Sequence, residues 1–345
     1  MKLLVAGGAG YIGGVVTRLL LDAGHEVVVL DDLSKGHRDA VPAGVRFVQG
    51  RVHDTAAEVL DPSFDGVLHF AAFIEAGESV ARPEKYWDNN LVGSLRLLAA
   101  MRSAGVRRIV FSSTAGVYGD PDELPIRESA SPRPPNPYGA SKLAVDYALR
   151  DEAVAYGVAA VSLRYFNVAG AHRCADGELL GERHDPESHL IPIALQVAAG
   201  RREKLQLYGD DYPTPDGTCL RDYIHITDLA NAHLLALSTM DCDADPATGR
   251  LTVPRSPSGT ATQGSHRIYN LGSGTGFSNR QVAEVARSVT GLPVPAEIAP
   301  RRAGDPAALV ASSDKARTEL GWAPHRPDLP DIVADAWEFY RRDLH

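Results

Sequence analysis

The stretch Leu3-Leu4-Val5-Ala6-Gly7-Gly8-Ala9-Gly10-Tyr11-Ile12-Gly13 decides the fold of this chain. Its four apolar residues predict a short buried strand, and the glycines at 8, 10 and 13 follow in the G-x-G-x-x-G spacing. Without Cβ atoms such a turn can approach a pyrophosphate, whose charge is favoured at the N-terminus of the helix expected over residues 11–23. The stretch therefore predicts a dinucleotide-binding unit.

The strand pattern extends through the first half of the chain. Short runs rich in Val, Ile and Leu alternate with amphipathic stretches of helical length, and the runs lie at residues 3–6, 27–30, 45–48, 67–70, 109–111 and 160–163. Near-continuous apolar strands separated by helices are typical of a parallel sheet covered on both faces. The fold class is therefore α/β, with a doubly wound Rossmann-type sheet and ligands beyond the carboxyl ends of its strands.

An acidic residue indicates which dinucleotide is bound. Asp31 follows Gly13 by 18 residues at the end of the second expected strand, where a carboxylate can accept ribose hydroxyls and would repel a 2′-phosphate. The sequence thus favours NAD over NADP, with Asp31 and the adjacent Asp32 as cofactor contacts. A second cluster, Gly272-Ser273-Gly274-Thr275-Gly276, lacks this spacing and is better interpreted as a structural turn.

The second half is less regular. We predict an NAD-binding domain over residues 1–169 and a smaller substrate domain over 170–345, with segments near 218–235 and 267–275 packing back on the first domain. A polar loop is expected over residues 171–188, a helix near 190–199 and a strand over 267–271. Residues 241–264 concentrate Pro, Ser, Thr, Gly and Asp and predict a surface insertion.

Composition excludes several classes of partner. The 345 residues carry a net charge of −9 without a basic run, which argues against nucleic acid. The apolar start ends at a glycine after a few residues and no other run approaches membrane length, so a cytoplasmic protein without membrane association is expected. Cys174, Cys219 and Cys242 lack metal-ligand spacing, so we expect free thiols and no metal site.

A Tyr and a Lys point to proton transfer. Tyr138 and Lys142 lie four residues apart after Pro137, in a segment that suits a helix, and therefore share a face. Such a pair alone is more often surface chemistry. Thr114, however, places a hydroxyl near the end of the fifth expected strand, beside the dinucleotide motif. An ammonium and a positive nicotinamide would lower the phenol pKa from its usual value of about 10, which makes Tyr138 a candidate base.

Further motifs carry a family resemblance. They are His69-Phe70-Ala71-Ala72, Gly77-Glu78-Ser79-Val80, Asp88-Asn89-Asn90, Arg164-Tyr165-Phe166-Asn167, His189-Leu190-Ile191-Pro192, Arg221-Asp222-Tyr223-Ile224-His225 and Arg301-Arg302-Ala303-Gly304-Asp305. With these the chain resembles, nearly end to end, the extended short-chain dehydrogenase/reductase family, and within it the UDP-glucose (UDP-galactose) 4-epimerases. The last four motifs are more specific than the glycine spacing.

The resemblance implies a set of site residues. The catalytic residues would be Thr114, Tyr138 and Lys142. The NAD contacts would be Gly7, Gly10, Tyr11, Ile12, Gly13, Asp31, Asp32, Val52, Phe70, Ala71, Ala72, Asn90, Lys142 and Tyr165. The UDP-hexose would be bound by Thr114, Tyr138, Asn167, His189, Leu190, Gln206, Tyr208, Arg221, Arg302 and Asp305. A diphosphate on an acidic protein needs local positive charge, which the guanidinium forks of Arg221 and Arg302 would offer.

The implied reaction is oxidation of the sugar at C4 to a 4-ketose, rotation of the ketose about its diphosphate link, and re-reduction on the other face, in a homodimer. Epimerases of UDP-N-acetylhexosamines or UDP-pentoses remain alternatives. A 4,6-dehydratase is disfavoured, because Ala115 and Gly116 stand where dehydratases generally have Asp-Glu. A non-catalytic NAD-binding regulator would not need Thr114, Tyr138 and Lys142 together.

The chain departs from the family pattern at several positions. Arg51-Val52 replaces an Asp-Ile or Asp-Leu pair that contacts adenine, which leaves the Val52 backbone for that role. Ile74 stands where some relatives have Lys. Leu309 stands at a position associated with the size of the C2 substituent, and a leucine there decides little. The segment 241–264 is also longer than expected, at modest thermodynamic cost for a surface loop.

Overall fold

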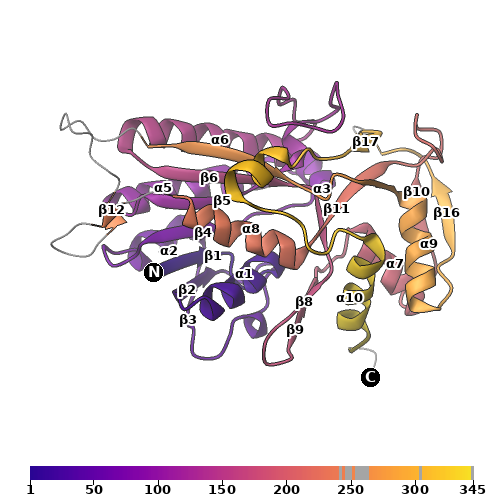
Figure 1. Ribbon diagram of the computed structural model, residues 1–345, viewed down its shortest axis with the longest axis horizontal. Helices are drawn as coiled ribbons and strands as arrows, with labels where there is room; N and C mark the ends of the chain where they lie inside the picture. The colour runs from indigo at the N-terminus through magenta and orange to yellow at the C-terminus, as the bar shows by residue number, and fades with distance from the viewer. Residues whose placement is uncertain (241–242, 245–250, 253–263, 303–304, 343–345) are drawn as a thin grey trace. The chain divides into compact units, whose positions relative to one another are not determined.

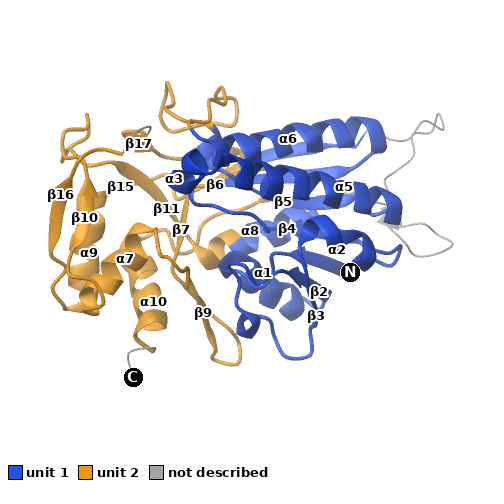
Figure 2. Cartoon of the chain, turned by 180° about the vertical axis from the view of Figure 1, so that it is seen from behind, with its two compact units in different colours: residues 1–117, 136–164, 230–269 blue, residues 118–135, 165–229, 270–345 orange. Residues whose placement is uncertain are grey.

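The chain divides into two compact units, shown in separate colours in Figure 2. The computed structural model describes residues 1–240, 243–244, 251–252, 264–302 and 305–342. Unit 1 consists of Met1–Val117, Asn136–Arg164 and Ala230–Tyr269, and unit 2 of Tyr118–Pro135, Tyr165–Leu229 and Asn270–His345. The chain therefore passes between the units several times. One of these passages, after residue 164, lies near the predicted boundary at 169.

Unit 1 is built on a seven-stranded sheet in the order β14-β6-β5-β4-β1-β2-β3 (Figure 1). The strands are β1 (Lys2–Ala6), β2 (Glu26–Asp31), β3 (Arg46–Gln49), β4 (Gly66–His69), β5 (Arg108–Thr114), β6 (Ala159–Tyr165) and β14 (His266–Leu271). Parallel registers run from β3 through β2, β1 and β4 to β5. This confirms the expected strands and the doubly wound fold. The strand order reverses direction beside β1, the position where such sheets bind ligands.

Helices cover both faces of this sheet. Buried side chains of α2 (Val52–Val59), α5 (Gly93–Ala104) and α6 (Pro137–Tyr156) form one apolar core with Leu4, Val28 and Ile109. Figures 1 and 2 show α1 (Tyr11–Asp22) and α8 (Ile226–Ser238) on the opposite face. Shorter helical segments complete the unit: η1 (Arg38–Ala40), α3 (Ala76–Ala81), α4 (Pro83–Tyr86), η2 (Trp87–Val92) and η3 (Ala115–Val117). Burial of the apolar strands between helix layers explains their near-continuous hydrophobicity.

Unit 2 combines small sheets with three amphipathic helices. The helices are α7 (Leu190–Ala198), α9 (Asn279–Thr290) and α10 (Leu329–Arg341), with the short turn η4 (Ala316–Leu320). The strands are β7 (Asn167–Ala169), β8 (Ala171–Arg173), β9 (Leu179–Gly181), β10 (Leu205–Tyr208), β11 (Leu220–His225), β15 (Gly276–Ser278), β16 (Ala296–Ala299) and β17 (Ala308–Leu309). The apolar faces of the three helices pack together with Leu205 and Leu207 in one core. This core holds β10 and α7 in place.

Several local predictions of the second half can be compared with the structure. The helix near 190–199 and the strand over 267–271 are confirmed as α7 and β14. The loop predicted over 171–188 is wrong in part, because β8 and β9 form an antiparallel hairpin within it. Gly177 has a φ of +86° and closes the turn between Cys174 and Glu178, whose backbone groups bond across it. Such short strands with polar residues leave little periodicity in the sequence.

The second glycine cluster is organised by a buried carboxylate. Asp222 accepts hydrogen bonds from the Ser273 amide at 2.7 Å, the Ser273 hydroxyl at 2.8 Å, and the Gly274 and Ala311 amides at 3.0 Å each. A Cβ at Gly272 would lie 2.5 Å from Asp222 Oδ2, so the chain can wrap around the carboxylate only with glycine there. The cluster therefore has the structural role that the sequence favours.

The remaining predictions concern thiols, the insertion and membranes. Cys174 and Cys219 are buried as thiols, while Cys242 lies outside the described residues. Of the predicted insertion, β12 (Asp243–Ala244) pairs with β13 (Leu251–Thr252), and most of the rest lies outside the described residues. In the described part of the chain, no helix has the length and apolar character that a membrane span requires.

Candidate active site

The glycine turn lies where β1 and β4 end. Gly7 has a φ of +85°, and a Cβ there would lie 2.5 Å from the Ala71 amide nitrogen. A Cβ at Gly13 would lie 2.1 Å from the Gly7 carbonyl oxygen. Gly10 is different: its nearest neighbour would be 3.4 Å away, and it caps α1 without a side chain to satisfy the first amides of that helix. The turn thus leaves amide donors for an anionic group at the start of α1.

Asp31 ties this turn to the end of β2. Its Oδ2 accepts a hydrogen bond from the Ala9 amide at 3.0 Å, and its Oδ1 accepts one from the Leu33 amide at 2.9 Å. Burial raises the pKa of Asp31, and these backbone bonds oppose the rise. A carboxylate has about four acceptor positions, so others remain for ribose hydroxyls. Asp32 is bound differently, since its carboxylate accepts the Ser34 amide at 2.8 Å.

The loop after β4 is held by an amide side chain. Asn90 lies in η2, a π-helical turn between α4 and α5, and is 2% exposed. Its Oδ1 accepts from the Phe73 amide and its Nδ2 donates to the Phe73 carbonyl, each at 2.9 Å. The same Nδ2 donates to Ser141 Oγ at 3.2 Å. Asn90 therefore fixes the loop that contains Phe70, Ala71 and Ala72 against α6.

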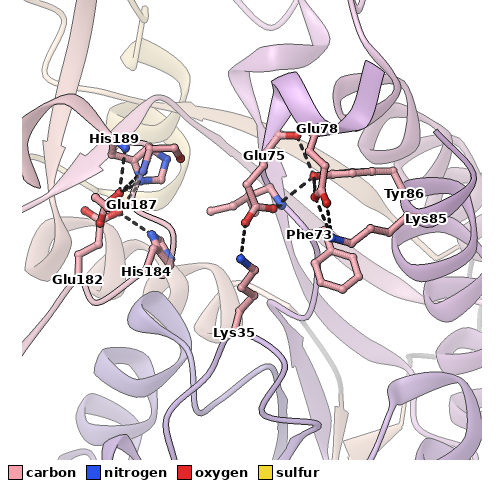
Figure 3. Close-up of polar contacts among 12 residues, drawn as sticks. Lys35, Phe73, Glu75, Glu78, Lys85, Tyr86, Glu182, His184, Glu187 and His189 are labelled. Atoms are coloured by element: carbon pink, nitrogen blue, oxygen red, sulfur yellow. Dashed lines mark hydrogen bonds and ion pairs between the residues drawn. The ribbon is translucent and has the colours of Figure 1, made fainter. Parts of the chain in front are cut away.

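An ion pair joins the loops after β2 and β4. Lys35 Nζ lies 3.0 Å from Glu75 Oε1, and Tyr86 donates to the Glu75 carbonyl at 2.8 Å (Figure 3). Burial favours the neutral Glu75 carboxyl, but hydrogen bonding and the charge of Lys35 prevail and hold its pKa below the usual value. Sequence reasoning missed this pair, since nothing in the pattern links positions 35 and 75.

Tyr138 and Thr114 come together at the start of α6. Asn136 caps this helix by accepting from the Gly139 amide at 2.9 Å, and Pro137 fills its first position. Thr114 ends β5, and its Oγ1 accepts from the Gly116 amide at 3.0 Å. A Cβ at Gly116 would lie 3.3 Å from Thr114 Oγ1 and 3.9 Å from Tyr138 Cε1. Both side chains therefore flank Gly116, and the first turn of α6 favours negative charge on Tyr138.

Lys142 is buried one turn further along α6. Its Nζ donates to the Ser112 carbonyl at 2.8 Å, and the residue is 3% exposed. Burial lowers the pKa of Lys142 to about 7, while the Asp146 carboxylate acts in the opposite direction. Asp146 in turn accepts from Arg164 Nη2 at 2.7 Å and Arg164 Nε at 3.0 Å. The sequence contains Tyr138, Lys142 and Asp146 at equal spacing of four, a signal that could have revealed the role of Asp146.

The protein's own groups oppose ionisation of Tyr138. Burial raises the pKa of Tyr138, the charge of Glu75 adds to the rise, and a hydrogen bond with Thr114 opposes it. The protein's own groups therefore favour a neutral phenol beside a readily neutralised amine. The phenolate expected from the sequence depends on Lys142 together with a positive nicotinamide, and burial of Tyr138 and Lys142 opposes it. A phenolate needs a further positive charge beside Tyr138.

Unit 2 carries a pocket of about 500 Å³ lined by polar and apolar residues. The predicted residues Asn167, His189, Leu190, Gln206, Tyr208, Arg221, Arg302 and Asp305 all line it, together with Ser188, Ile193, Arg202, Glu203, Lys204, Leu205, Tyr223 and Asn279. Its size suits a small-molecule site. The lining has four cationic and two acidic side chains, so positive charge exceeds negative. Sequence reasoning missed Arg202 and Lys204, whose positions carry no motif.

Side chains alternate between the two faces of β10, and two of the pocket residues lie on its less buried face. Leu205 and Leu207 are buried in the core, while Gln206 and Tyr208 point to the other face, and the Tyr208 hydroxyl donates to Gln206 Oε1 at 2.9 Å. The Arg302 guanidinium lies 3.8 Å from the centre of the Tyr208 ring. An aromatic face with a cation stacked on it suits a planar base or an anionic group.

Arg221 is held differently from Arg302. It is paired with Asp305 and donates to the Leu220 carbonyl at 2.8 Å. Its neighbour across the sheet is Leu309, since β11 and β17 pair in parallel with Arg221 opposite Leu309. The side chain of Arg221 is 11% exposed, so its guanidinium is preorganised rather than solvated.

The other positions singled out in the sequence are placed as follows. Tyr165 ends β6, and Tyr11 and Ile12 begin α1. Val52 is buried as the first residue of α2. Arg51 precedes it and donates to Asp88 Oδ2 at 2.8 Å on the surface. Arg51, at the end of the loop after β3, is thus paired with Asp88 of η2.

The comparisons with known proteins agree with this arrangement. A family model described as the NAD dependent epimerase/dehydratase family matches residues 3–248. The chain is 57% identical over 345 residues to a UDP-glucose 4-epimerase of Streptomyces lividans, covering 98% of this chain and 96% of that protein.

Two solved structures are similar over nearly the whole chain. The UDP-glucose 4-epimerase from Brucella ovis in complex with NAD has a TM-score of 0.87 and 44% identity, covering 98% of each chain. The UDP-glucose 4-epimerase from Bifidobacterium longum in complex with NAD+ and UDP has a TM-score of 0.87 and 36% identity, covering 100% of this chain and 99% of that chain. With a family model over more than half of its length and relatives that match throughout, the chain belongs to the NAD dependent epimerase/dehydratase family.

Proposed function

We propose that this protein interconverts UDP-galactose and UDP-glucose by NAD-dependent epimerisation at C4. The observation that carries the proposal is that unit 1 joins the glycine turn to buried Thr114 and Lys142 and half-buried Tyr138 at the carboxyl edge of one sheet. Unit 2 adds a pocket with excess positive charge of the kind a nucleoside diphosphate needs. A regulator that merely binds a dinucleotide would have no use for the buried Lys142.

The residues of unit 1 fit NAD. The amides at the start of α1 suit the pyrophosphate, and Asp31 keeps acceptor positions for the adenosine ribose. The proposed contacts are completed by Tyr11, Ile12, Val52, Phe70, Ala71, Ala72, Asn90, Lys142 and Tyr165. When bound, NAD accepts a hydride from the sugar carbon and returns it. Asp31 also disfavours a 2′-phosphate, which supports NAD rather than NADP.

The proton of the sugar 4-hydroxyl is handled by Tyr138. As a phenolate it accepts this proton during oxidation, and as a phenol it returns it after the sugar has turned its other face. Thr114 donates a hydrogen bond that favours the phenolate, and Lys142 supplies the positive charge. Asp146 and Asn90 touch neither sugar nor proton; they position the groups that do.

The pocket of unit 2 holds the nucleotide. Arg221 and Arg302 bind the diphosphate. Tyr208 stacks on the uracil, and Gln206 accepts a hydrogen bond from the Tyr208 hydroxyl. Asn167, His189, Leu190 and Asp305 complete this proposed contact set. The reaction requires a firmly held diphosphate and a loosely held sugar, so charged contacts concentrated on the nucleotide fit it.

We also propose that the protein acts as a homodimer in the cytoplasm. Large apolar side chains are exposed along η2, α5 and α6, including Trp87 (36%), Leu95 (43%), Tyr147 (48%) and Val154 (65%). A second copy would cover such residues. Buried thiols at Cys174 and Cys219 suit a reducing compartment.

A substrate panel tests the activity. Purified protein is incubated without added NAD with UDP-galactose, UDP-N-acetylgalactosamine and UDP-arabinose, and the C4 epimer of each is measured. We expect UDP-galactose to be converted fastest, and Tyr138→Phe to lower kcat by about 10² or more, because the proton acceptor is lost. Conversion of none of the three would refute the proposal. If UDP-N-acetylgalactosamine or UDP-arabinose were converted faster than UDP-galactose, that sugar would be the preferred substrate instead.

The pH dependence of the reaction tests the role of Asp146. Lys142 must keep its proton, so activity falls as pH rises through its pKa; Asp146 raises that pKa, and its removal lowers it. For Asp146→Asn we expect the alkaline limb of kcat/KM to move to lower pH, with about threefold to tenfold lower kcat/KM above pH 8.

The matched control for this prediction is Asp151→Asn, an exposed residue of the same helix. Asp146→Asn also breaks a buried ion pair with Arg164, so both variants are first checked for native circular dichroism. A loss of activity in Asp146→Asn that is equal at every pH would contradict the assigned role.

Neighbouring arginines test the nucleotide pocket. Arg302 lines the pocket, whereas Arg301 lies over the Tyr212 ring and pairs with Asp211. We expect Arg302→Ala to weaken UDP binding about tenfold, because a charge-assisted contact to phosphate is lost, and Arg301→Ala to leave it nearly unchanged. Isothermal titration with UDP measures both. Equal weakening in the two variants would argue against a specific phosphate contact.

A further inference from the structure

Four potential metal ligands converge in unit 2, in the segment that connects β9 to α7. Glu182 directly follows β9, and His189 directly precedes the first residue of α7. His184 and Glu187 lie between them, and Figure 3 shows the four side chains pointing toward one another. Both ends of the segment are therefore anchored in regular structure, which limits how far the ligands can separate.

The distances between the ligand atoms of these four residues are close to those found around a single metal ion. One oxygen or nitrogen of each residue lies within 4.8 Å of all the others. Glu182 Oε1 is 2.9 Å from His184 Nδ1 and closer still to His189 Nδ1. Glu187 Oε1 lies 3.7 Å from the same His189 nitrogen. Ligand atoms of a tetrahedral zinc ion, at bond lengths of about 2.0–2.2 Å, are roughly 3.4 Å apart. Small side-chain rotations therefore suffice to close the set around an ion.

Burial makes the two carboxylates costly on their own. The side chains of Glu182 and Glu187 are 6% and 3% exposed. Glu187 Oε1 accepts from the Ser188 amide at 2.7 Å and the His189 amide at 2.9 Å, which fixes its orientation. Glu182 also contacts both imidazoles, and Glu187 contacts that of His189. Two adjacent buried carboxylates require compensating positive charge, which a bound cation would supply.

His184 supplies an independent indication. Its Nδ1 is buried without a hydrogen-bond partner, although Glu182 Oε1 is only 2.9 Å away. An ion between these two atoms would satisfy this buried nitrogen and the Glu182 oxygen together.

We propose that Glu182, His184, Glu187 and His189 form a binding site for a divalent transition-metal ion of the zinc type. Imidazole nitrogens with carboxylate oxygens are ligands that suit zinc, whereas magnesium and calcium prefer oxygen alone. The positive end of α7 disfavours a cation, but two carboxylates outweigh its partial charge. The ion braces the segment before α7, whose first residue Leu190 lines the nucleotide pocket. The sequence predicts no metal, because its cysteines lack metal-ligand spacing.

Metal titration of the full-length protein tests this site. After dialysis against EDTA, Zn²⁺ is titrated by calorimetry in the absence of UDP. We expect one equivalent per chain, with binding at least tenfold weaker in the double variant Glu182→Gln/His184→Asn. The spectrum of Co²⁺ bound in place of Zn²⁺ should show tetrahedral coordination without thiolate charge-transfer bands, which excludes Cys174 and Cys219 as the ligands.

The control is Glu284→Gln/His325→Asn, which makes the same chemical changes at exposed positions of unit 2. It should bind Zn²⁺ as the wild type does. If the first double variant fails to fold, the single variant His184→Asn is used. The site is refuted by the absence of stoichiometric binding at micromolar Zn²⁺, by equal affinity in the site variant and wild type, or by thiolate bands. In each of these cases the cluster is held by ion pairs alone. None of these results bears on epimerase activity.

Discussion

The proposed chemistry depends on how one proton is shared between Tyr138 and Lys142. A phenol beside an amine and a phenolate beside an ammonium contain the same number of protons, so the two residues form one coupled system. Burial of both groups favours the neutral form, which is why the pKa of Tyr138 is raised and that of Lys142 is lowered to about 7. The proposed catalysis requires the charged form, which the positive charge of an oxidised nicotinamide would favour.

Much of unit 1 serves to hold this pair in place. The Asn136 cap sets the first turn of α6, and the Ser112 carbonyl receives the Lys142 ammonium at the end of β5. Below it, the buried pair of Asp146 and Arg164 provides a fixed negative charge. Burial gives these charges more influence on one another than they would have in water. A small number of fixed groups can therefore adjust the protonation of a base without touching the substrate.

The cofactor edge is stiffened by contacts that are distant in sequence. Asn90 holds the loop after β4, Asp31 holds the glycine turn, and Lys35 with Glu75 joins the loops after β2 and β4. Each loop is bound by at least one side chain from another element. Such preorganisation limits what must be ordered when a dinucleotide binds.

Sequence alone predicts the parts of this structure that are local. The apolar runs predict the strands of unit 1, and the glycine spacing predicts the turn, because each pattern follows from nearby residues. The resemblance to a family supplied the pocket residues of unit 2. What the sequence does not show is long-range pairing, such as Lys35 with Glu75 or Arg51 with Asp88. It also does not show burial, which raises the pKa of Tyr138.

The most direct test is an ultraviolet titration of the phenolate of Tyr138, obtained as the difference between the wild type and Tyr138→Phe over a range of pH. It is performed with the protein loaded with NAD and after the cofactor has been removed. The account predicts that Tyr138 ionises above its usual pKa of about 10 without NAD and close to neutrality with it. The same ionisation midpoint in both forms would contradict the account.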